Sequence, residues 1–342
     1  MKLLIITDNN VWGGSELMWY QLHKRRDVAS AVWSLHGIDW MPADVRCVPD
    51  RRPLRDRLRP WRRRTRRLPL HHECDRVLYV MCFFCDALVA QFLEHAGAFV
   101  DRGKPLTILV QAVSEDRWLE DSLRTRLDAF APRVNWVFVS AANAETVKKQ
   151  IPNAPASRVI CNIPLGDFVS LPLDEESNWA FVGRCHAESK GLDLLIESCV
   201  GFPVTVDVYG DGPNREALTD YALSVGSNVR FCGHCDQVAE IWRNHAVLVL
   251  CSRIEGTPIA LLEAGLCGRP AIVTRVGGGP ELVGTDGGIV AEANVRAIRA
   301  ALAAMLGRKS EWLAMGARLQ ERCTRVVHSD PVAALKRVLE GT

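Results

Sequence analysis

Residues 179–252 decide the fold class, because short apolar runs there alternate with segments of helical character. The apolar runs are WAFVG (179–183), VTVDVYG (204–210), NVRFCG (228–233) and AVLVLCS (246–252). Such continuous apolar runs are typical of parallel strands buried on both faces. Between the first two lies GLDLLIESC (191–199), which has the apolar spacing of a helix. The alternation predicts a doubly wound parallel sheet, whose ligands bind beyond the carboxyl ends of its strands.

The same alternation nearer the N-terminus predicts a second sheet. Its strand-like runs are KLLIIT (2–7), AVWSL (31–35), RVLYVMCFF (76–84), LTILVQ (106–111) and WVFVS (136–140). A chain of 342 residues and 38.0 kDa suits two ordinary domains. We therefore expect an α/β protein in which two Rossmann-like, doubly wound domains face a cleft.

The expected domain limits follow from a change of composition in the middle of the chain. The stretch PLGDFVSLPLDEES (164–177) is rich in Pro, Leu and acids and reads as a linker. We expect a first, N-terminal domain at 1–164, a linker at 165–177 and a second domain at 178–310. Residues 311–342 are predicted to be helical, and they could pack back on the first domain.

The overall composition excludes several classes of protein. Hydrophobic residues make up 48% and charged residues 24%, values that fit a soluble protein with sizeable cores and not a disordered one. A net charge of +2 gives no support to general nucleic-acid binding. The apolar run at the N-terminus is short for a signal peptide, and no run is suited to crossing a bilayer. We expect a cytoplasmic protein whose 12 cysteines are reduced.

Gly13-Gly14-Ser15-Glu16 lies between the first predicted strand and the first predicted helix. Two glycines let the backbone approach a ligand closely, and the free N–H groups of a helix start attract anions. The motif is therefore a candidate anion-binding loop. A tight strand-to-helix turn without any ligand explains the same residues equally well.

Arg184 and Lys190 flank the start of the helix that follows the WAFVG run. A guanidinium and an ammonium beside a helix N-terminus can hold a diphosphate from two sides. The alternative is a solvated basic loop.

Two carboxylates eight residues apart, Glu255 and Glu263, form the most specific pattern. Pro258 suits the first turn of a helix, so we expect that helix to begin at Thr257 to Pro258. The free N–H groups of Thr257 and Ile259 would then face the ligand edge of the sheet. Glu263 would lie semi-buried in the helix, where a carboxylate needs a polar partner. Such a site suits a polyhydroxylated, phosphorylated ligand such as a nucleotide sugar.

These residues together resemble the retaining, nucleotide-sugar-dependent glycosyltransferases of family 4, which have the two-domain GT-B fold. The matching motifs are FVGR (181–184), KG (190–191), YGDGP (209–213), VRFCG (229–233), the E-x7-E pattern of 255–263, CGRP (267–270) and GGGPE (277–281). The resemblance is dense over residues 178–290. In the N-terminal half it rests on GGSE (13–16), which is similar to the family's GGxE, and on the general layout.

The resemblance implies a role for each matching residue. Arg184, Lys190 and Glu255 would be the catalytic groups, with the first two stabilising the charge of the departing diphosphate. The remaining implied contacts are Gly13 and Gly14 on the diphosphate, Thr257, Pro258 and Ile259 beside Glu255 on the donor sugar, Glu263 on the ribose, and His234 and Cys235 on the nucleobase. No Asp-x-Asp motif stands in a convincing loop, so the resemblance implies neither a metal nor a cofactor.

Gln111 is a departure from the family, whose members usually have a histidine after the fourth strand of the first domain. A glutamine can donate and accept hydrogen bonds but cannot titrate. We expect Gln111 to bind the donor sugar in place of that histidine. A different donor, or impaired activity, are the alternatives.

Two CxxC pairs, Cys82 to Cys85 and Cys232 to Cys235, invite a zinc interpretation, as do His71, His72 and Cys74. The pairs lie in different predicted domains and have apolar, strand-like flanks. Free cysteine commonly behaves as a small buried hydrophobe. We therefore predict thiols and no metal site.

The segment from Arg46 to Arg67 holds 11 arginines, two acids and three prolines. It can be a solvated loop, a patch that meets anionic lipid headgroups, or a cradle for an anionic acceptor. Each basic residue near an anionic membrane contributes about 1 kcal/mol. Trp61 and several leucines add an amphipathic character.

The resemblance implies a metal-independent hexosyltransferase that moves a sugar from a nucleotide diphosphate-sugar to a hydroxyl acceptor with retention. Family habit and the basic segment point to bacterial polysaccharide or glycolipid assembly, with an acceptor that could be lipid-linked or anionic. The enzyme would be cytoplasmic, with peripheral contact at the inner face of the membrane as an option. A catalytically impaired subunit of the same fold and a nucleotide-sugar epimerase are the alternatives.

Overall fold

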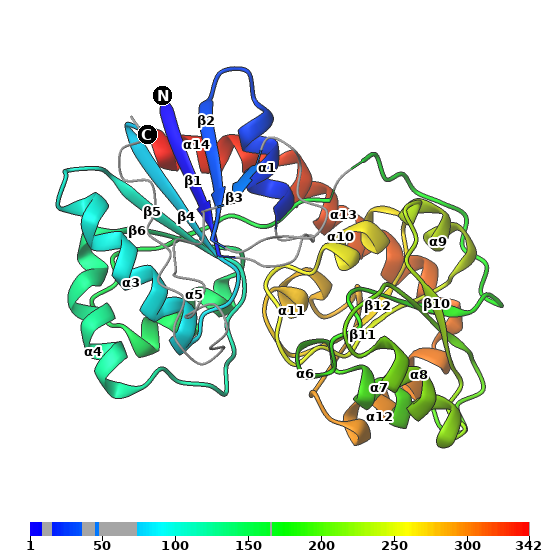
Figure 1. Cartoon of the computed structure of the whole chain (residues 1–342). Helices are drawn as coiled ribbons and strands as arrows, with labels where there is room; N and C mark the ends of the chain where they lie inside the picture. The colour runs from blue at the N-terminus through cyan, green and yellow to red at the C-terminus, as the bar shows by residue number, and fades with distance from the viewer. Residues whose placement is uncertain (9–15, 36–44, 48–73, 165, 342) are drawn as a thin grey trace. The chain divides into compact units, whose positions relative to one another are not determined.

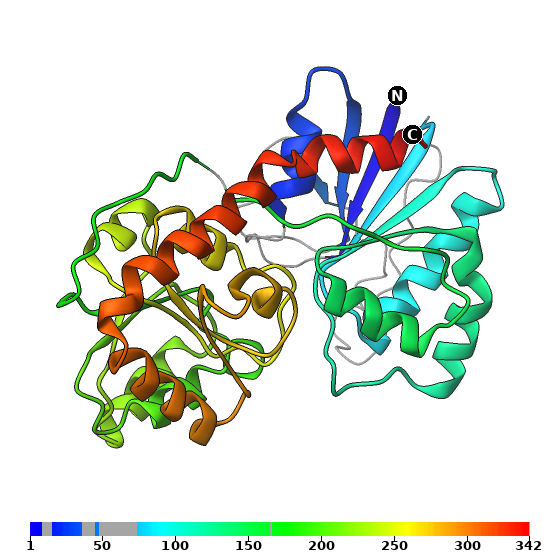
Figure 2. The ribbon, with the colours of Figure 1, turned by 180° about the vertical axis from the view of Figure 1, so that it is seen from behind.

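The computed structural model describes residues 1–8, 16–35, 45–47, 74–164 and 166–341. These residues form two compact units, drawn in Figures 1 and 2. Unit 1 comprises Met1–Asn162 together with Pro331–Thr342, and unit 2 comprises Ile163–Asp330. Each unit is built on a single parallel sheet.

Unit 1 contains a seven-stranded parallel sheet with the order β3-β2-β1-β4-β5-β6-β7. Its strands are β1 Lys2–Thr7, β2 Ala29–Ser34, β3 Val45–Cys47, β4 Arg76–Met81, β5 Leu106–Val110, β6 Asn135–Phe138 and β7 Arg158–Val159. The central strands β1, β4 and β5 are buried along almost their whole length. Burial on both faces explains why these strands appear in the sequence as continuous apolar runs.

The helices of unit 1 connect successive strands, apart from the last one, which returns from the C-terminus. They are α1 Leu17–Lys24, α3 Asp86–Val100, α4 Asp121–Phe130, a 3₁₀ turn at Ala131–Arg133, α5 Ala141–Gln150 and α14 Pro331–Glu340. Helix α14 packs beside α1, as Figures 1 and 2 both show. The ammonium of Lys336 lies 2.6 Å from the carboxylate of Asp27, and Arg76 donates to the carbonyl of Glu340. The end of the chain is thus part of unit 1.

Unit 2 contains a six-stranded parallel sheet with the order β10-β9-β8-β11-β12-β13. Its strands are β8 Trp179–Val182, β9 Val206–Tyr209, β10 Val229–Gly233, β11 Leu248–Leu250, β12 Ala271–Thr274 and β13 Gly288–Ala291. Its helices are α6 Ala187–Lys190, α7 Leu192–Ser198, α8 Arg215–Ser224, α9 Val238–Asn244, α10 Ile259–Leu266, α11 Gly279–Val283, α12 Val295–Leu306, a 3₁₀ turn at Lys309–Glu311 and α13 Trp312–His328.

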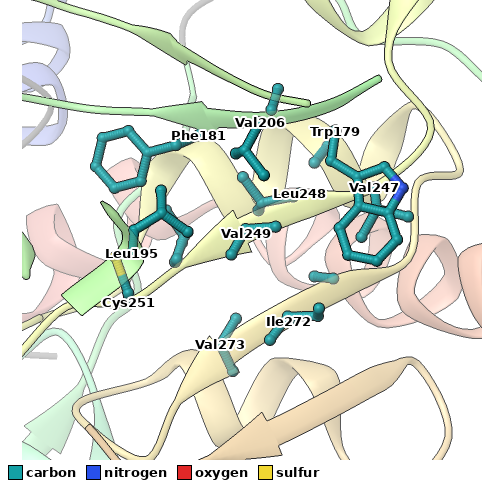
Figure 3. Close-up of a cluster of buried hydrophobic side chains, with 14 of the residues drawn as sticks. Trp179, Phe181, Leu195, Val206, Val247, Leu248, Val249, Cys251, Ile272 and Val273 are labelled. Carbon is teal, nitrogen blue, oxygen red and sulfur yellow. The ribbon is translucent and has the colours of Figure 1, made fainter. Parts of the chain in front are cut away.

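The core of unit 2 is made of side chains from the central strands and from the helices that cover them. Figure 3 shows Trp179, Phe181, Val206 and Leu248 among them, and all four are fully buried. Burying one large apolar side chain contributes about 1.5–3 kcal/mol. This core holds the sheet rigid, and so fixes the loops at the carboxyl ends of its strands.

The C-terminal helices divide between the two units, which differs from the expected single segment at 311–342. Helix α13 packs on α10 of unit 2, while α14 joins unit 1. Two glycines allow α13 to come close. A Cβ atom at Gly316 would overlap the carbonyl oxygen of Gly268, and one at Gly265 would overlap the thiol of Cys323. These close approaches bind α13 to unit 2.

The predicted linker at 165–177 is also fixed to unit 2 over its described part. Arg269 is 1% exposed, and its guanidinium donates to the carbonyls of Leu171 and Pro172 and to that of Trp242. The N–H of Leu171 in turn donates to the carbonyl of Cys267. The boundary between the units lies earlier, at 162–163, because a buried arginine holds the apparent linker.

Two parallel sheets, each with helices between its strands, confirm the predicted α/β class and the two Rossmann-like domains. In the described part of the chain, no helix is both long and apolar enough to span a bilayer.

Candidate functional site

The carboxyl ends of β8, β9 and β11 in unit 2 approach one another very closely. Gly210 follows β9, and a Cβ atom there would overlap the carbonyl oxygen of Gly183, which follows β8. A Cβ atom at Gly191 would likewise overlap the carbonyl of Cys251. The φ of Gly191 is +60°, which is unfavourable for any residue other than glycine. Glycine is therefore required at both positions, and the loops that carry Arg184, Lys190 and Glu255 meet at one edge of the sheet.

Lys190 and Glu255, which the sequence assigns to different parts of a ligand, are in direct contact. The ammonium Nζ of Lys190 lies 2.6 Å from Oε1 of Glu255. The Glu255 side chain is 8% exposed and that of Lys190 is 26% exposed. Ser252 Oγ donates to the same carboxylate oxygen, also at 2.6 Å. The carboxylate is thus held by a cation and by a neutral hydroxyl.

The loop that carries Lys190 is held by a second ion pair. Arg253 makes two parallel hydrogen bonds to the carboxylate of Asp193, of 2.8 and 2.6 Å, and donates to the carbonyl of Ala187. Its backbone N–H donates to the carbonyl of Ser189. Bidentate arginine–carboxylate contacts fix geometry as well as adding energy. They hold the loop after β11 against the short helix α6.

The start of helix α10 faces the loop before α11. The helix begins at Ile259, slightly later than the predicted start at Thr257 to Pro258, because Pro258 has an extended ψ of 114° and serves as the N-cap. The N–H of Gly278 donates to the carbonyl of Gly256 at 2.7 Å. Gly277 has a φ of +55°, and a Cβ atom there would overlap the carbonyl of Glu255. The GGGPE segment thus packs directly against the loop of the first glutamate.

Glu263 lies in the second turn of α10 and is 8% exposed. Burial raises the pKa of its carboxyl to about 7, and no described group opposes this effect. The side chain is more deeply buried than expected, and it makes no hydrogen bond or ion pair within the described residues. A largely buried carboxylate that has no donor from the protein gains stability when a ligand supplies one.

Strand β8 is followed by Gly183 and then by Arg184. The side chain of Arg184 is partly exposed. In the part of the chain that the structure describes, Arg184 forms no ion pair and no side-chain hydrogen bond. Its guanidinium is therefore available to an anion, at the same sheet edge as Lys190. The roles that the sequence gives to both residues stay predictions.

The residues predicted to meet a nucleobase follow β10. His234 is exposed, with its Nε2 2.9 Å from a carboxylate oxygen of Asp236, and Cys235 is partly buried. Beside them, the guanidinium of Arg215 lies against Gly233. A Cβ atom added at Gly233 would lie 3.3 Å from the nearest guanidinium nitrogen. Arg215 also lines a cavity of about 480 Å³ at the first turns of α8, together with Asp211 and Asp220. Arg215 lies in none of the motifs that point to a ligand in the sequence.

In unit 1, Gln111 directly follows β5 and is 3% exposed. Its Oε1 accepts a hydrogen bond of 2.9 Å from the side chain of Asn162, and its Nε2 has no partner among the described residues. Neither the partner Asn162 nor the depth of Gln111 could be read from the sequence. The predicted contact of Gln111 with a donor sugar stays a prediction. Gly13 and Gly14 lie outside the described residues.

Asp8, at the end of β1, is a buried carboxylate that sequence reasoning missed. Burial raises its pKa to about 7, although the backbone N–H of Cys82 donates to Oδ1 at 2.8 Å. Its Oδ2 has no partner within the described residues. A lone aspartate after an apolar strand gives no signal of this kind, because burial depends on residues distant in sequence.

The cysteines of the described residues include no disulfide, and those of both CxxC pairs are free thiols. No group of three or more His, Cys, Asp or Glu side chains that could hold a metal ion occurs among residues that the structure describes. His71 and His72 lie outside that part of the chain, as does most of the segment 46–67.

Comparisons with known proteins match the C-terminal part of the chain. Residues 176–308 match the family model of glycosyl transferases group 1. The chain is 34% identical over 119 residues to the uncharacterized glycosyltransferase MJ1178 of Methanocaldococcus jannaschii, covering 33% of each protein. It is 33% identical over 123 residues to the GtfA subunit of a UDP-N-acetylglucosamine–peptide N-acetylglucosaminyltransferase of Streptococcus parasanguinis, covering 33% of this chain and 24% of that one. The matches thus span a third or less of these relatives.

The whole chain is similar in fold to a solved structure. The Anabaena protein Alr3699/HepE, crystallised in complex with UDP, superposes with a TM-score of 0.73 at 16% identity, covering 100% of both chains. At this identity the likeness shows the fold alone, and it confirms the predicted GT-B architecture. Residues 176–308 contain every predicted site residue of unit 2, from Arg184 to Glu263.

Proposed function

We propose that this protein is a retaining glycosyltransferase of family 4, which transfers a hexose from a nucleotide diphosphate-sugar to a hydroxyl acceptor without a metal. The observation that carries the proposal is the Lys190–Glu255 ion pair at the carboxyl ends of the unit 2 strands, with Arg184 directly after β8 and the buried Glu263 in α10. The match of 176–308 to the group 1 glycosyltransferases supports it. A UDP complex of the Anabaena protein of similar fold makes UDP the first nucleotide to test.

The geometry of unit 2 supports a division of the donor among these four residues. Arg184 and Lys190 would hold the diphosphate and stabilise the charge that develops on it as the sugar leaves. Glu255, with the backbone of Thr257, Pro258 and Ile259, would bind the hydroxyls of the donor sugar. The buried carboxylate of Glu263 would accept hydrogen bonds from the ribose diol, which supplies the donors that the protein lacks there.

Metal-free catalysis is consistent with this donor arrangement. Two positive side chains, one of them not engaged by any described residue, can neutralise the charge that a divalent cation otherwise carries. We expect release of nucleoside diphosphate in the presence of EDTA at the rate seen with added Mg²⁺. A rate that depends on Mg²⁺ would contradict this part of the proposal.

A donor panel tests the proposed function directly. Purified protein is incubated with UDP-, GDP- and ADP-sugars, and the Tm and the released nucleoside diphosphate are measured for each. We expect one base to raise the Tm and to support slow hydrolysis of the donor, because water replaces the missing acceptor. Binding without any turnover would favour a catalytically impaired subunit, and no binding to any donor would overturn the proposal.

We also propose that the acceptor is anionic or lipid-linked, used in bacterial polysaccharide or glycolipid assembly on the cytoplasmic side of the membrane. The support is the sequence from Arg46 to Arg67, whose 11 arginines favour anionic surfaces. Sedimentation with vesicles of anionic lipid should show binding that falls with salt and with Arg62, Arg63 and Arg64 changed to Ser. Equal binding by this variant would exclude a role for the segment.

A further inference from the structure

We propose that Ser252 is a positioning residue, which keeps the carboxylate of Glu255 oriented when Lys190 turns from Glu255 to the donor diphosphate. This inference rests on the proposed function, because it needs a phosphate that competes for Lys190. Neither the sequence motifs nor the comparisons assign a role to Ser252.

Lys190 and Ser252 donate to the same carboxylate oxygen of Glu255. Oε1 of Glu255 accepts one hydrogen bond from Lys190 and one from Ser252, both of 2.6 Å. A carboxylate oxygen has two lone pairs, so both positions on Oε1 are filled. The unliganded protein therefore satisfies this oxygen with one charged donor and one neutral donor.

The donor diphosphate would compete with Glu255 for the ammonium of Lys190. Its side chain is 26% exposed, whereas that of Glu255 is 8% exposed, so the ammonium can reach an incoming anion and the carboxylate cannot follow it. A diphosphate carries more negative charge than a carboxylate, and it attracts the ammonium more strongly. When Lys190 turns toward it, the hydroxyl of Ser252 still donates to Oε1.

Ser252 itself is held in place by burial and by a backbone hydrogen bond. The side chain is fully buried directly after β11, and the carbonyl oxygen of Ser252 accepts a 2.5 Å hydrogen bond from the hydroxyl of Thr274. The preceding Cys251 donates through its thiol to the carbonyl of Lys190. Ser252 therefore stays in place while Lys190 moves. A carboxylate aligned in this way can meet the hydroxyls of the donor sugar without reorganising.

Ser252→Ala tests the role, with Ser198→Ala as its matched control. Both serines are fully buried in unit 2, and Ser198 donates to the backbone carbonyl of Leu194 instead of to a carboxylate. UDP-glucose and UDP-N-acetylglucosamine are the donors, with initial rates measured on whichever the wild type hydrolyses faster. We expect Ser252→Ala to lower kcat about tenfold, which corresponds to about 1.4 kcal/mol.

The affinity for UDP separates this role from a general structural one. UDP lacks the sugar that Glu255 would bind, so its Kd should stay within about twofold of wild type in Ser252→Ala. Ser198→Ala should leave both kcat and the UDP Kd unchanged. Ser252→Thr keeps the hydroxyl and should recover most of kcat, provided that its Tm equals that of wild type.

The outcomes distinguish this inference from the proposed function. If the wild type hydrolyses a donor and Ser252→Ala has the same kcat as Ser198→Ala, the role of Ser252 is wrong and the proposed function stands. A parallel loss of kcat and UDP affinity in Ser252→Ala would also overturn it, since that indicates a general distortion. If the wild type binds no nucleotide and hydrolyses no donor, both proposals fall together.

Discussion

At the residue scale, Glu263 is destabilising in the unliganded protein. Its pKa of about 7 compares with 4.5 for an exposed glutamate, so the folded state holds the proton more tightly than the unfolded state. Stability is therefore full below about pH 4.5 and falls as the pH rises to about 7. The whole shift corresponds to roughly 3 kcal/mol.

Glu263→Gln should remove this pH dependence and separate stability from binding. We expect a higher Tm than wild type at about pH 8, and an equal Tm at about pH 4.5, because glutamine stays neutral. The same variant should bind UDP at least tenfold more weakly, since an amide accepts hydrogen bonds from a ribose diol less well than a carboxylate. Thermal melts at both pH values and calorimetric titration with UDP check the two halves. Unchanged UDP affinity would remove Glu263 from the ribose site.

Asp207 in β9 shows the opposite pH dependence. Burial alone would raise its pKa, but hydrogen bonds from His245 and Arg230 outweigh burial and lower it to about 2. Nδ1 of His245 lies 2.7 Å from the carbonyl oxygen of Ile241, and Nε2 lies 3.0 Å from this carboxylate. The contribution of Asp207 is present above about pH 4 and is lost as the pH falls toward 2.

Asp207→Asn should lower the free energy of unfolding by roughly 2 kcal/mol at neutral pH, with the difference from wild type shrinking at acid pH. Asp236→Asn is the control, because Asp236 is almost fully exposed. Urea unfolding at about pH 7 and about pH 3 measures both. If Asp207→Asn matches the control at neutral pH, the buried ion pair does not stabilise unit 2.

At the scale of the elements, the contact between α10 and α13 depends on Gly316. Its Cβ atom would overlap the carbonyl of Gly268, so Gly316→Ala should destabilise unit 2 by about 1–3 kcal/mol through overpacking. Gly307→Ala is the matched control, since its φ is −70° and no atom lies within 3.4 Å of the added carbon. The control should be neutral or slightly stabilising. Equal Tm values for the two variants would contradict the close helix packing.

Particular elements show how far sequence reasoning reaches in this chain. The buried strands were predictable because burial on both faces makes each one a continuous apolar run, as in LTILV at 106–110. Helix α4 begins only at Asp121, because the side chains of Gln150 and Asp86 accept hydrogen bonds from the N–H groups of Leu119 and Glu120. Those partners lie about 30 residues away in sequence, where periodicity carries no information.

In the candidate site too, contacts between residues distant in sequence could not be predicted. The motifs located Lys190 and Glu255 and assigned one to phosphate and the other to sugar, and the structure shows them in contact. The bond from Ser252 and the isolation of Glu263 depend on side-chain orientation, which spacing does not give. Gln111 directly follows β5, as predicted, but its partner Asn162 lies 51 residues further on.

At the scale of the whole molecule, unit 1 is completed by the C-terminal helix α14. Its buried residues Val332, Leu335 and Leu339 belong to unit 1, and each contributes about 1.5–3 kcal/mol when buried. Truncation after Asp330 should therefore destabilise unit 1 by several kcal/mol and leave unit 2 folded, seen as a lower-temperature transition in calorimetry. Lys336→Ala in the full chain is the control and should change stability by less than about 1 kcal/mol. A single unchanged transition after truncation would contradict the division of the chain.

The central claim is that unit 2 binds a nucleoside diphosphate through Arg184, Lys190 and Glu263. Calorimetric titration of wild type, Lys190→Ala and Lys309→Ala with UDP, GDP and ADP tests it most directly. Lys309 is a suitable control because its side chain is 31% exposed, close to the 26% of Lys190, and it pairs with a glutamate, the exposed Glu176, far from the predicted site residues. We predict that one nucleotide binds wild type and Lys309→Ala alike, and binds Lys190→Ala at least tenfold more weakly, a difference of about 1.4 kcal/mol. Equal affinity of all three proteins, or no binding by wild type, would contradict the claim.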